Sequence, residues 1–243
     1  QQFVVPKGTV KTLALKCNVS GAAASGATAT LSWGMTATQI GTTMSVTGVT
    51  STGSVTATGA TFAGNSMTVG TASLAATGDT SGTAYKVASA GTTGVTSSAF
   101  RFRATNDNVD LQRIVLKLTN TASSSSSDLT QVHIFDGNTE VGTAVFTGGN
   151  GFATSTLNTP VHLLRDTDKV LTVKIDLGAI SNSSAVTTSG HLINVDIDTN
   201  DTAGTYGTGV GSGVRVNSSG STIIAGTGVK VFRSYPSFAQ DSL

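Results

Sequence analysis

Apolar and polar residues alternate along much of the chain with a period of two. In the segment 13–19, leucine, leucine, cysteine and valine occupy every second position. Residues 100–103 place two phenylalanines on one face and two arginines on the other. Alternation of this kind puts successive side chains on opposite faces of a β-strand. No segment shows a helical period, so the pattern predicts strands throughout the chain.

Turn signals separate these predicted strands about every 10–15 residues. The run Asp136-Gly137-Asn138-Thr139, for example, lies between two apolar segments and is typical of a hairpin turn. Regularly spaced strands of this kind favour an antiparallel β-sandwich. We therefore predict an all-β protein with an Ig-like antiparallel sandwich at about 95–197. The expected core positions are Phe100, Phe102, Ile114, Leu116, Leu118, Val132, Ile134, Leu171, Val173, Ile175 and Leu177.

A second copy of the segment 13–19 lies at 171–177. The apolar residues, a lysine and the polar residue before the last apolar one fall at equivalent positions in both. Further alignments join 31–38 to 193–200, 47–53 to 208–213, and 63–69 to 225–231. The offset drifts only from 158 to 162 residues, and the length changes lie in Gly/Ser-rich segments, where loops absorb them at little cost. The chain therefore resembles tandem units with a period of roughly 160 residues, in about one and a half repeats.

This repeat divides the chain into three expected parts. Residues 1–78 form a partial unit, which is the C-terminal part of a β-sandwich unit followed by a Gly/Thr-rich β segment. Residues 79–231 form a complete unit, in which a Gly/Ser-rich β segment at 198–231 follows the sandwich. Residues 232–243 form a junction to the next unit or subunit. Because the first unit is partial, the apolar face of 13–19 is expected to need cover from outside.

Composition narrows the class of protein. Only 11% of the residues are charged, against roughly 25% in ordinary soluble domains, and Thr, Ser and Gly take their place. A net charge of +1 offers no electrostatic footprint for nucleic acid or an anionic membrane. No apolar run reaches the roughly 18 residues of a membrane span. This balance suits an extracellular structural β protein better than a cytosolic enzyme.

The single cysteine and the start of the chain add two expectations. Cys17 has no internal disulfide partner, and its repeat counterpart is Ile175, so we expect it to be a small buried hydrophobic residue. The sequence starts at Gln1 and shows no charged region followed by an apolar run. A signal peptide is therefore expected to be absent or already removed.

Three stretches carry a resemblance to a known group of proteins. They are FRFRATNDNVDLQRIVLKLTN, DLTQVHIFDGNTEVGTAVF and DKVLTVKIDL. These stretches resemble the tandem Ig-like β-sandwich repeats of large bacterial cell-surface and S-layer-type proteins, with the most similar ones in candidate-phylum bacteria. The resemblance implies export, a structural or adhesive role at the surface, and no enzymatic activity. It transfers no functional residues, because it consists of patterns of buried strands.

Candidate chemistry is sparse. His133, His162 and His191 lie in three separate contexts, with no Cys, Asp or Glu at metal-ligand spacing. Serine is abundant, but no G-x-S-x-G elbow precedes a helix. The glycine-rich stretch 207–213 has β signals on both sides, so we interpret it as tight turns or bulges rather than a phosphate loop. We expect no catalytic, cofactor-binding or metal-binding residue.

Two acidic clusters keep calcium open as a hypothesis, because calcium takes six to eight oxygen ligands that alternate residues of a loop can supply. The clusters are Asn106, Asp107, Asn108 and Asp110, and Asp196, Asp198, Asn200 and Asp201. The first repeat has Gly34, Thr36, Thr38 and Gln39 in place of the second cluster. Asn and Asp also favour turns on their own account, so the clusters do not require an ion.

Two functional classes follow from these observations. The first is a non-enzymatic extracellular structural protein, a subunit or segment of a surface filament, sheath or S-layer, whose partners are neighbouring copies joined through the chain ends. The alternative is an adhesin-like stalk or carbohydrate-binding surface module, with cell-wall or surface glycans as partners. It ranks second because sugar sites present aromatic platforms, whereas aromatic residues make up 5% of this chain and Trp33 is its one tryptophan. Neither class involves nucleic acid or membrane insertion.

Overall fold

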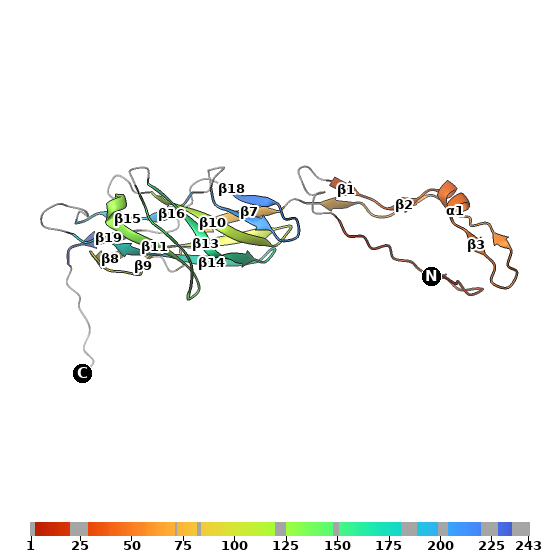
Figure 1. The fold of residues 1–243 in the computed structure, drawn as a ribbon, viewed down its shortest axis with the longest axis horizontal. Coiled ribbons are helices and arrows are strands. Elements are labelled where there is room, and N and C mark those ends of the chain that lie inside the picture. Colours follow the sequence, from red (N-terminus) through yellow and green to blue (C-terminus); the bar gives the residue numbers. More distant parts are fainter. Residues whose placement is uncertain are drawn as a thin grey trace, which may run out of the picture.

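The structure, a computed structural model, describes residues 3–19, 29–70, 72–81, 84–119, 125–147, 151–180, 189–198, 204–219 and 228–234. Figure 1 shows a β-rich body and a thin arm that projects from one of its ends. We call residues 3–70 the N-terminal arm and residues 73–234 the sandwich. The prediction of an all-β protein is confirmed, since strands make up nearly all of the regular structure.

One path of hydrogen-bonded strands forms the sandwich. Its order is β12-β11-β14-β9-β7-β18-β17-β10-β13, and β16 pairs with β10 beside this path. The path folds back on itself, because Gly142 of β12 packs closely against Leu157 of β13. The bounds are β7 Ser73–Gly78, β9 Val95–Thr105, β10 Val109–Leu118, β11 Leu129–Asp136, β12 Thr139–Ala144, β13 Phe152–Leu163, β14 Asp168–Leu177, β16 Val195–Ile197, β17 Tyr206–Gly209 and β18 Arg215–Ser219. A 3-10 turn at Ser126–Asp128 precedes β11.

A smaller sheet lies at one end of the sandwich. It contains β15 (Leu192–Ile193), β19 (Val229–Phe232) and β8 (Lys86–Ser89), in that order. The pairs β19–β8 and β18–β7 are parallel, whereas the other ladders are antiparallel. The prediction of a purely antiparallel sandwich therefore needs correction at these two pairs. In both of them a strand from the end of the unit returns to lie beside a strand from its beginning.

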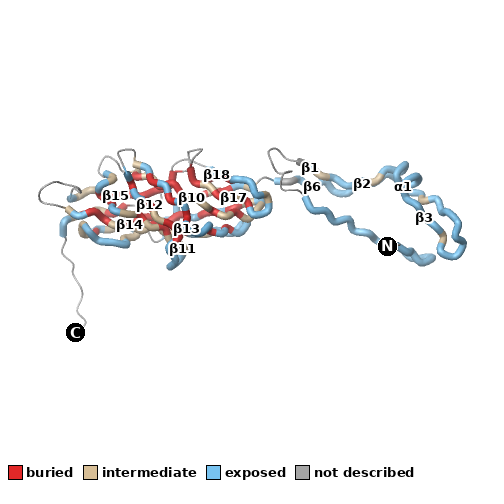
Figure 2. Tube along the Cα trace, viewed as in Figure 1, coloured by how far each residue is buried: buried red, intermediate tan, exposed pale blue. Residues whose placement is uncertain are grey.

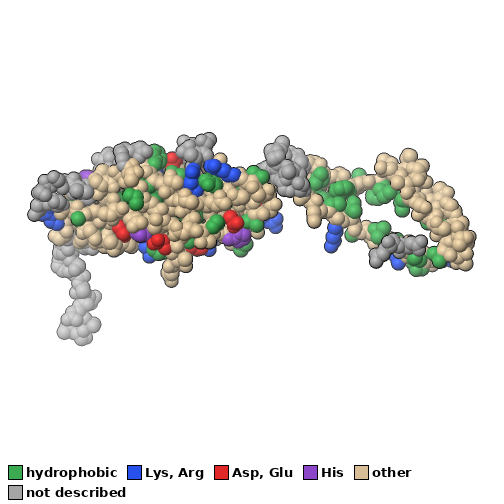
Figure 3. Space-filling model, in the orientation of Figure 1, with side chains coloured by type: hydrophobic (Ala, Val, Ile, Leu, Met, Phe, Trp, Pro, Cys, Tyr) green, Lys and Arg blue, Asp and Glu red, His purple; other side chains and the backbone are tan. Residues whose placement is uncertain are grey.

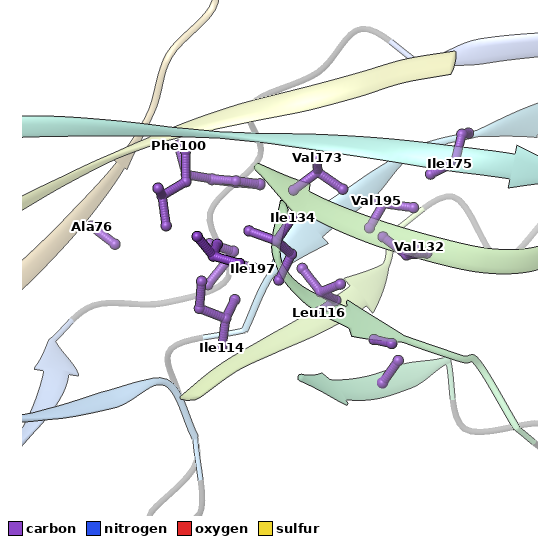
Figure 4. Close-up of a cluster of buried hydrophobic side chains, with 14 of the residues drawn as sticks. Ala76, Phe100, Ile114, Leu116, Val132, Ile134, Val173, Ile175, Val195 and Ile197 are labelled. Atoms are coloured by element: carbon purple, nitrogen blue, oxygen red, sulfur yellow. The ribbon is translucent and has the colours of Figure 1, made fainter. Parts of the chain in front are cut away.

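The core lies between the folded layers. All eleven positions predicted from the alternation are buried, as the red segments of Figure 2 indicate for the body as a whole. Figure 4 shows Phe100, Ile134 and Ile197 gathered in the space between the strands. The predicted hairpin is present too, since Gly137 with its positive φ links β11 to β12. The period of two therefore located the inward faces of β9, β10, β11 and β14.

The sandwich extends beyond its predicted bounds of about 95–197. Strand β7, which the repeat comparison assigns to the first unit, pairs along its length with β9 and buries Leu74. The next residue, Asp79, accepts hydrogen bonds from the hydroxyl and backbone N–H of Ser81 and pairs with Arg101. Together these donors hold the pKa of Asp79 at about 2. The sandwich therefore includes β7, whose small side chains give little apolar signal in the sequence.

Strand β16 departs from simple alternation because both of its faces are buried. Asp196 is fully buried like the apolar Val195 and Ile197 on either side of it, and the flanking Asn194 and Asp198 are buried too. Asp196 accepts hydrogen bonds from the hydroxyl of Thr119 at 2.5 Å and the side-chain amide of Asn194 at 3.0 Å. Burial of a carboxylate is tolerable only with such donors. Strand β16 is therefore an internal strand rather than one with a solvent face.

The N-terminal arm contains three nested two-stranded ladders. The pairs are β1–β6, β2–β5 and β3–β4, and none of these strands pairs with a strand of the sandwich. Their bounds are β1 Ala29–Leu31, β2 Gly34–Met35, β3 Val46–Thr47, β4 Ser54–Val55, β5 Phe62–Ala63 and β6 Met67–Val69. Residues 29–69 thus form one long, interrupted hairpin whose tip is the turn between β3 and β4.

One helix, α1 (Ala37–Thr43), interrupts this hairpin and contradicts the expectation of strands alone. Thr36 caps it, since its hydroxyl accepts a hydrogen bond from the backbone N–H of Gln39 and the Gln39 side chain accepts one from the backbone N–H of Thr36. The seven residues of α1 are too few to display a helical period. Among the described helices, none is long and apolar enough to cross a membrane.

We predict that the core of β10 is sensitive to truncation. Leu116→Ala should lower the free energy of unfolding by about 2–5 kcal/mol, because the fully buried leucine leaves a cavity. Val210→Ala, at a half-exposed turn position, is the matched control and should cost less than about 0.5 kcal/mol. Urea unfolding, followed by far-UV circular dichroism, measures the free energy of unfolding of both variants. Equal losses in the two variants would contradict the assignment of the core.

Candidate functional site

Large apolar side chains are exposed along the whole N-terminal arm. Figure 3 shows them as green patches on both limbs of the arm. They are Phe3, Val4, Val5, Val10, Leu13, Leu15, Val19, Trp33, Met44, Val46, Val49, Val55, Phe62 and Met67. Many large apolar side chains exposed in one region of a folded protein mark an interaction site. The arm is therefore the candidate functional site.

Residues 13–19 form no strand, although their pattern predicts one. Leu13 and Leu15 are each 72% exposed, whereas their counterparts Leu171 and Val173 in β14 are each 1% exposed. The difference lies in the neighbours, because β14 is paired with β9 on one side and β11 on the other. The arm lacks both of these strands. The expectation that Cys17 is buried is wrong for the same reason, since the thiol is exposed.

The arm nevertheless reproduces the local structure of the end of the sandwich. In the β1–β6 ladder Leu31 lies opposite Met67, and in the β15–β19 ladder Ile193 lies opposite Val229. Ile193 follows Leu31 by 162 residues, and Val229 follows Met67 by the same number. This is the offset found in the sequence alignment. The two ladders therefore have the same register.

The tip of the arm matches the β17–β18 hairpin in the same way. Gly48 donates its backbone N–H to Gly53 O at 2.9 Å, and Gly209 donates its backbone N–H to Val214 O at 2.9 Å. In each turn the first glycine has no room for a Cβ, because a serine hydroxyl three residues later would lie 2.3 Å from it. The glycine-rich stretch 207–213 is thus a hairpin turn, as the sequence predicted.

A further match lies at the beginning of the arm. Thr9 donates its backbone N–H to Pro6 O at 3.1 Å, and Thr167 donates its backbone N–H to Leu164 O at 3.2 Å. The residue before each threonine has a positive φ, 75° at Gly8 and 59° at Asp166. The same turn therefore precedes the segment 13–19 and strand β14.

The histidines occupy three separate places, and each contacts a carboxylate. His162 and Asp110 are cross-strand partners on β13 and β10, with Nδ1 and Oδ1 2.6 Å apart. His191 Nδ1 lies 2.9 Å from Oδ2 of the buried Asp128. No local sequence pattern reveals these pairs, because only tertiary structure brings residues so distant in sequence together. Within the described ranges, no group of three or more His, Cys, Asp or Glu side chains could hold a metal ion.

His133 contacts two carboxylates at once, on the surface formed by β11, β12 and β14. Its Nδ1 lies 2.8 Å from Glu140 and its Nε2 lies 3.2 Å from Asp176. Burial by itself lowers the pKa of His133, but the hydrogen bonds to Asp176 and Glu140 outweigh it and raise the pKa overall. The ring of His133 therefore links β11 to β12 and β14 through these two contacts.

The first acidic cluster serves the protein's own backbone. Asp107 accepts hydrogen bonds from the backbone N–H groups of Gly211 and Ser212, and Asn108 accepts one from that of Arg165. Asp107 thereby holds the turn at 209–213, and Asn108 holds the turn at 164–167. In the second cluster Asp196 is satisfied by Thr119 and Asn194, while Asn200 and Asp201 lie outside the described residues.

We predict a pH dependence of stability that originates at His133. Its folded pKa exceeds the unfolded value of about 6.5, so its contribution is complete below that pH and is lost as the pH rises through the folded pKa. Over this pH range, the free energy of unfolding of the unaltered protein should fall by up to about 1 kcal/mol more than that of His133→Gln. Urea unfolding at a series of pH values measures the difference. Parallel stability curves for the two proteins would contradict the prediction.

Comparisons with known proteins leave the family of this chain open. A scan against models of protein families finds no match, and a search of curated proteins finds no significant match. The membership in tandem surface repeats that the sequence suggests therefore stays a prediction.

Proposed function

We propose that this protein is a non-enzymatic, extracellular structural element. It is a subunit or segment of a surface filament, sheath or S-layer whose units join through β-strands at their ends. One observation carries the proposal: the N-terminal arm repeats the local structure of the end of the sandwich, while its apolar side chains lie in water. A neighbouring unit is the natural source of cover for such an arm.

The energy of the uncovered arm supports this joining role. Each large apolar side chain moved out of water contributes roughly 1.5–3 kcal/mol. Leu13, Leu15 and Val19 together therefore offer a substantial driving force for association. The short ladders of the arm also leave backbone groups at their edges that can accept another strand. A contact between one end of a unit and another surface of its neighbour does not close on itself, so it propagates a fibre or a sheet.

The surface composition supports the same role. The chain has few charges and many hydroxyl groups, so its copies repel one another only weakly. Some of the charged residues at the sandwich surface pair with each other, as Arg103 does with Asp168 and Lys169 with Asp136. A body of this kind can pack densely beside its neighbours.

The alternative role, an adhesin-like stalk or carbohydrate-binding module, has one observation in its favour. Trp33 and Tyr85 are about half exposed, and exposed aromatic rings can stack on sugars. They do not form a single platform in the structure, since Trp33 belongs to the arm and Tyr85 precedes β8 in the sandwich. The structural role therefore remains the first proposal.

We predict that association of the purified protein depends on the apolar face of 13–19. The double variant Leu13→Ser/Leu15→Ser should abolish ordered polymers in negative-stain images and leave a monomer in sedimentation. The matched double variant Thr12→Ser/Ala14→Ser alters the alternate positions of the same segment and should assemble normally. The thermal unfolding of the sandwich should be unchanged in both variants. Normal polymers from the leucine variant would contradict the proposal.

A further inference from the structure

We infer that the N-terminal arm is the back half of a second sandwich, and that its partner is a polypeptide carrying a front half with no back half of its own. By front half we mean strands equivalent to β7–β13, and by back half the strands equivalent to β14–β19. The inference deepens the proposed function and rests on it, because it names the partner of the same arm.

Equivalent residues of the arm and of the complete unit share local structure but differ in burial. Met67 is 51% exposed and Val55 is 48% exposed, whereas their counterparts Val229 and Val216 are 1% and 7% exposed. The ladders that contain these pairs have the same register in both copies. Two ladders of the arm therefore already have the register of a back half, whereas residues 13–19 lack the neighbours that make β14 a strand.

In the complete unit, the front half buries the back half. Strand β14 lies between β9 and β11, and both β16 and β17 pair with β10. Strand β18 pairs with β7, and β19 pairs with β8. These front-half strands supply the backbone partners and the apolar surface that the arm lacks. The arm therefore needs strands of the front-half type to cover it.

Residues 1–243 include two back halves, the arm and β14–β19, and one front half, which β14–β19 already occupies. A second copy of these residues therefore offers the arm no front half unless it uncovers its own back half. The specific partner of the arm is expected to bring an unoccupied front half from outside residues 1–243.

The residues of the arm indicate what this partner presents. In the complete unit the ammonium group of Lys174 lies over the ring of Phe135, 4.3 Å from its centre. Lys16 occupies the equivalent position in the arm. Phe135 lies two residues along β11 from His133, the register partner of Lys174. The partner's strand beside 13–19 is therefore expected to carry an aromatic ring diagonal to Lys16, with apolar residues at alternate positions.

Cys17 provides the test, because it is exposed in the arm while its counterpart Ile175 is fully buried. The probe is residues 73–163 of this chain, a front half that contains no cysteine. Adding it to the full chain, at a concentration where the chain alone sediments as a monomer, should slow maleimide labelling of Cys17 roughly tenfold or more, since a buried thiol reacts only through opening. The Leu13→Ser/Leu15→Ser variant should show no protection.

A second form of the test does not require the probe to fold alone. Residues 73–160 are joined directly ahead of residue 3 of the full chain, which reproduces the connection through the turn at 164–167. The fusion should protect Cys17 and add a second cooperative unfolding unit. Unchanged labelling of Cys17 in the fusion overturns the inference.

Two further outcomes separate the inference from the proposed function. If the Cys17→Ala full-length chain protects Cys17 of the unaltered chain as well as the front half does, a second copy is the partner and the inference is overturned. A third result is possible, in which polymers depend on Leu13 and Leu15 but neither the added probe nor the fused segment protects Cys17. That result would leave the proposed function standing and overturn the inference. Protection without any polymers would support the inference and overturn the proposed function.

Discussion

An apolar β-strand is stable only between neighbours, and the rest of this structure depends on that constraint. Backbone N–H and C=O groups need partners, and alternate apolar side chains need a surface to pack against. Strand β14 has both, because β9 and β11 flank it in register. Residues 13–19 carry almost the same pattern without these neighbours, and they form an exposed segment with no strand. One pattern thus has two outcomes within a single chain.

The same constraint explains how the sandwich closes. Its last strands return to its first ones, as the parallel pairs β18–β7 and β19–β8 show. The chain between residues 73 and 232 therefore forms a unit that shares strands with nothing else among the described residues. Strands β12 and β13 are the two ends of the long hydrogen-bonded path, and each pairs with one neighbour in it.

Polar groups inside the sandwich serve its architecture. Asp196 and Asp107 accept hydrogen bonds from the protein itself, and His133 bridges two carboxylates across neighbouring strands. These contacts lie in separate places and fix loops and ladders. In a chain with so few charges, each of them restricts the register of the strands it joins.

The sequence by itself determined the strands, the core and the repeat offset. A period of two identifies the inward face of a strand such as β9 from Phe100 and Phe102 alone, because side-chain direction alternates by geometry. The turns of the arm also follow from local residues, as Gly48 and Gly209 demonstrate with their matching hydrogen bonds. Short or atypical elements escaped this reasoning. Helix α1 depends on one capping box, and β7 consists mostly of small residues.

Only the tertiary structure decided which copies of the pattern are buried. Cys17 and Ile175 stand at equivalent positions, yet one is exposed and the other is enclosed by β9 and β11. The carboxylate partners of the histidines also required the strand register, which no local pattern encodes. Local sequence sets the conformation of a segment through neighbouring residues in the chain. Burial depends instead on strands that lie far away in sequence, and for the arm those strands are not among the described residues of this chain.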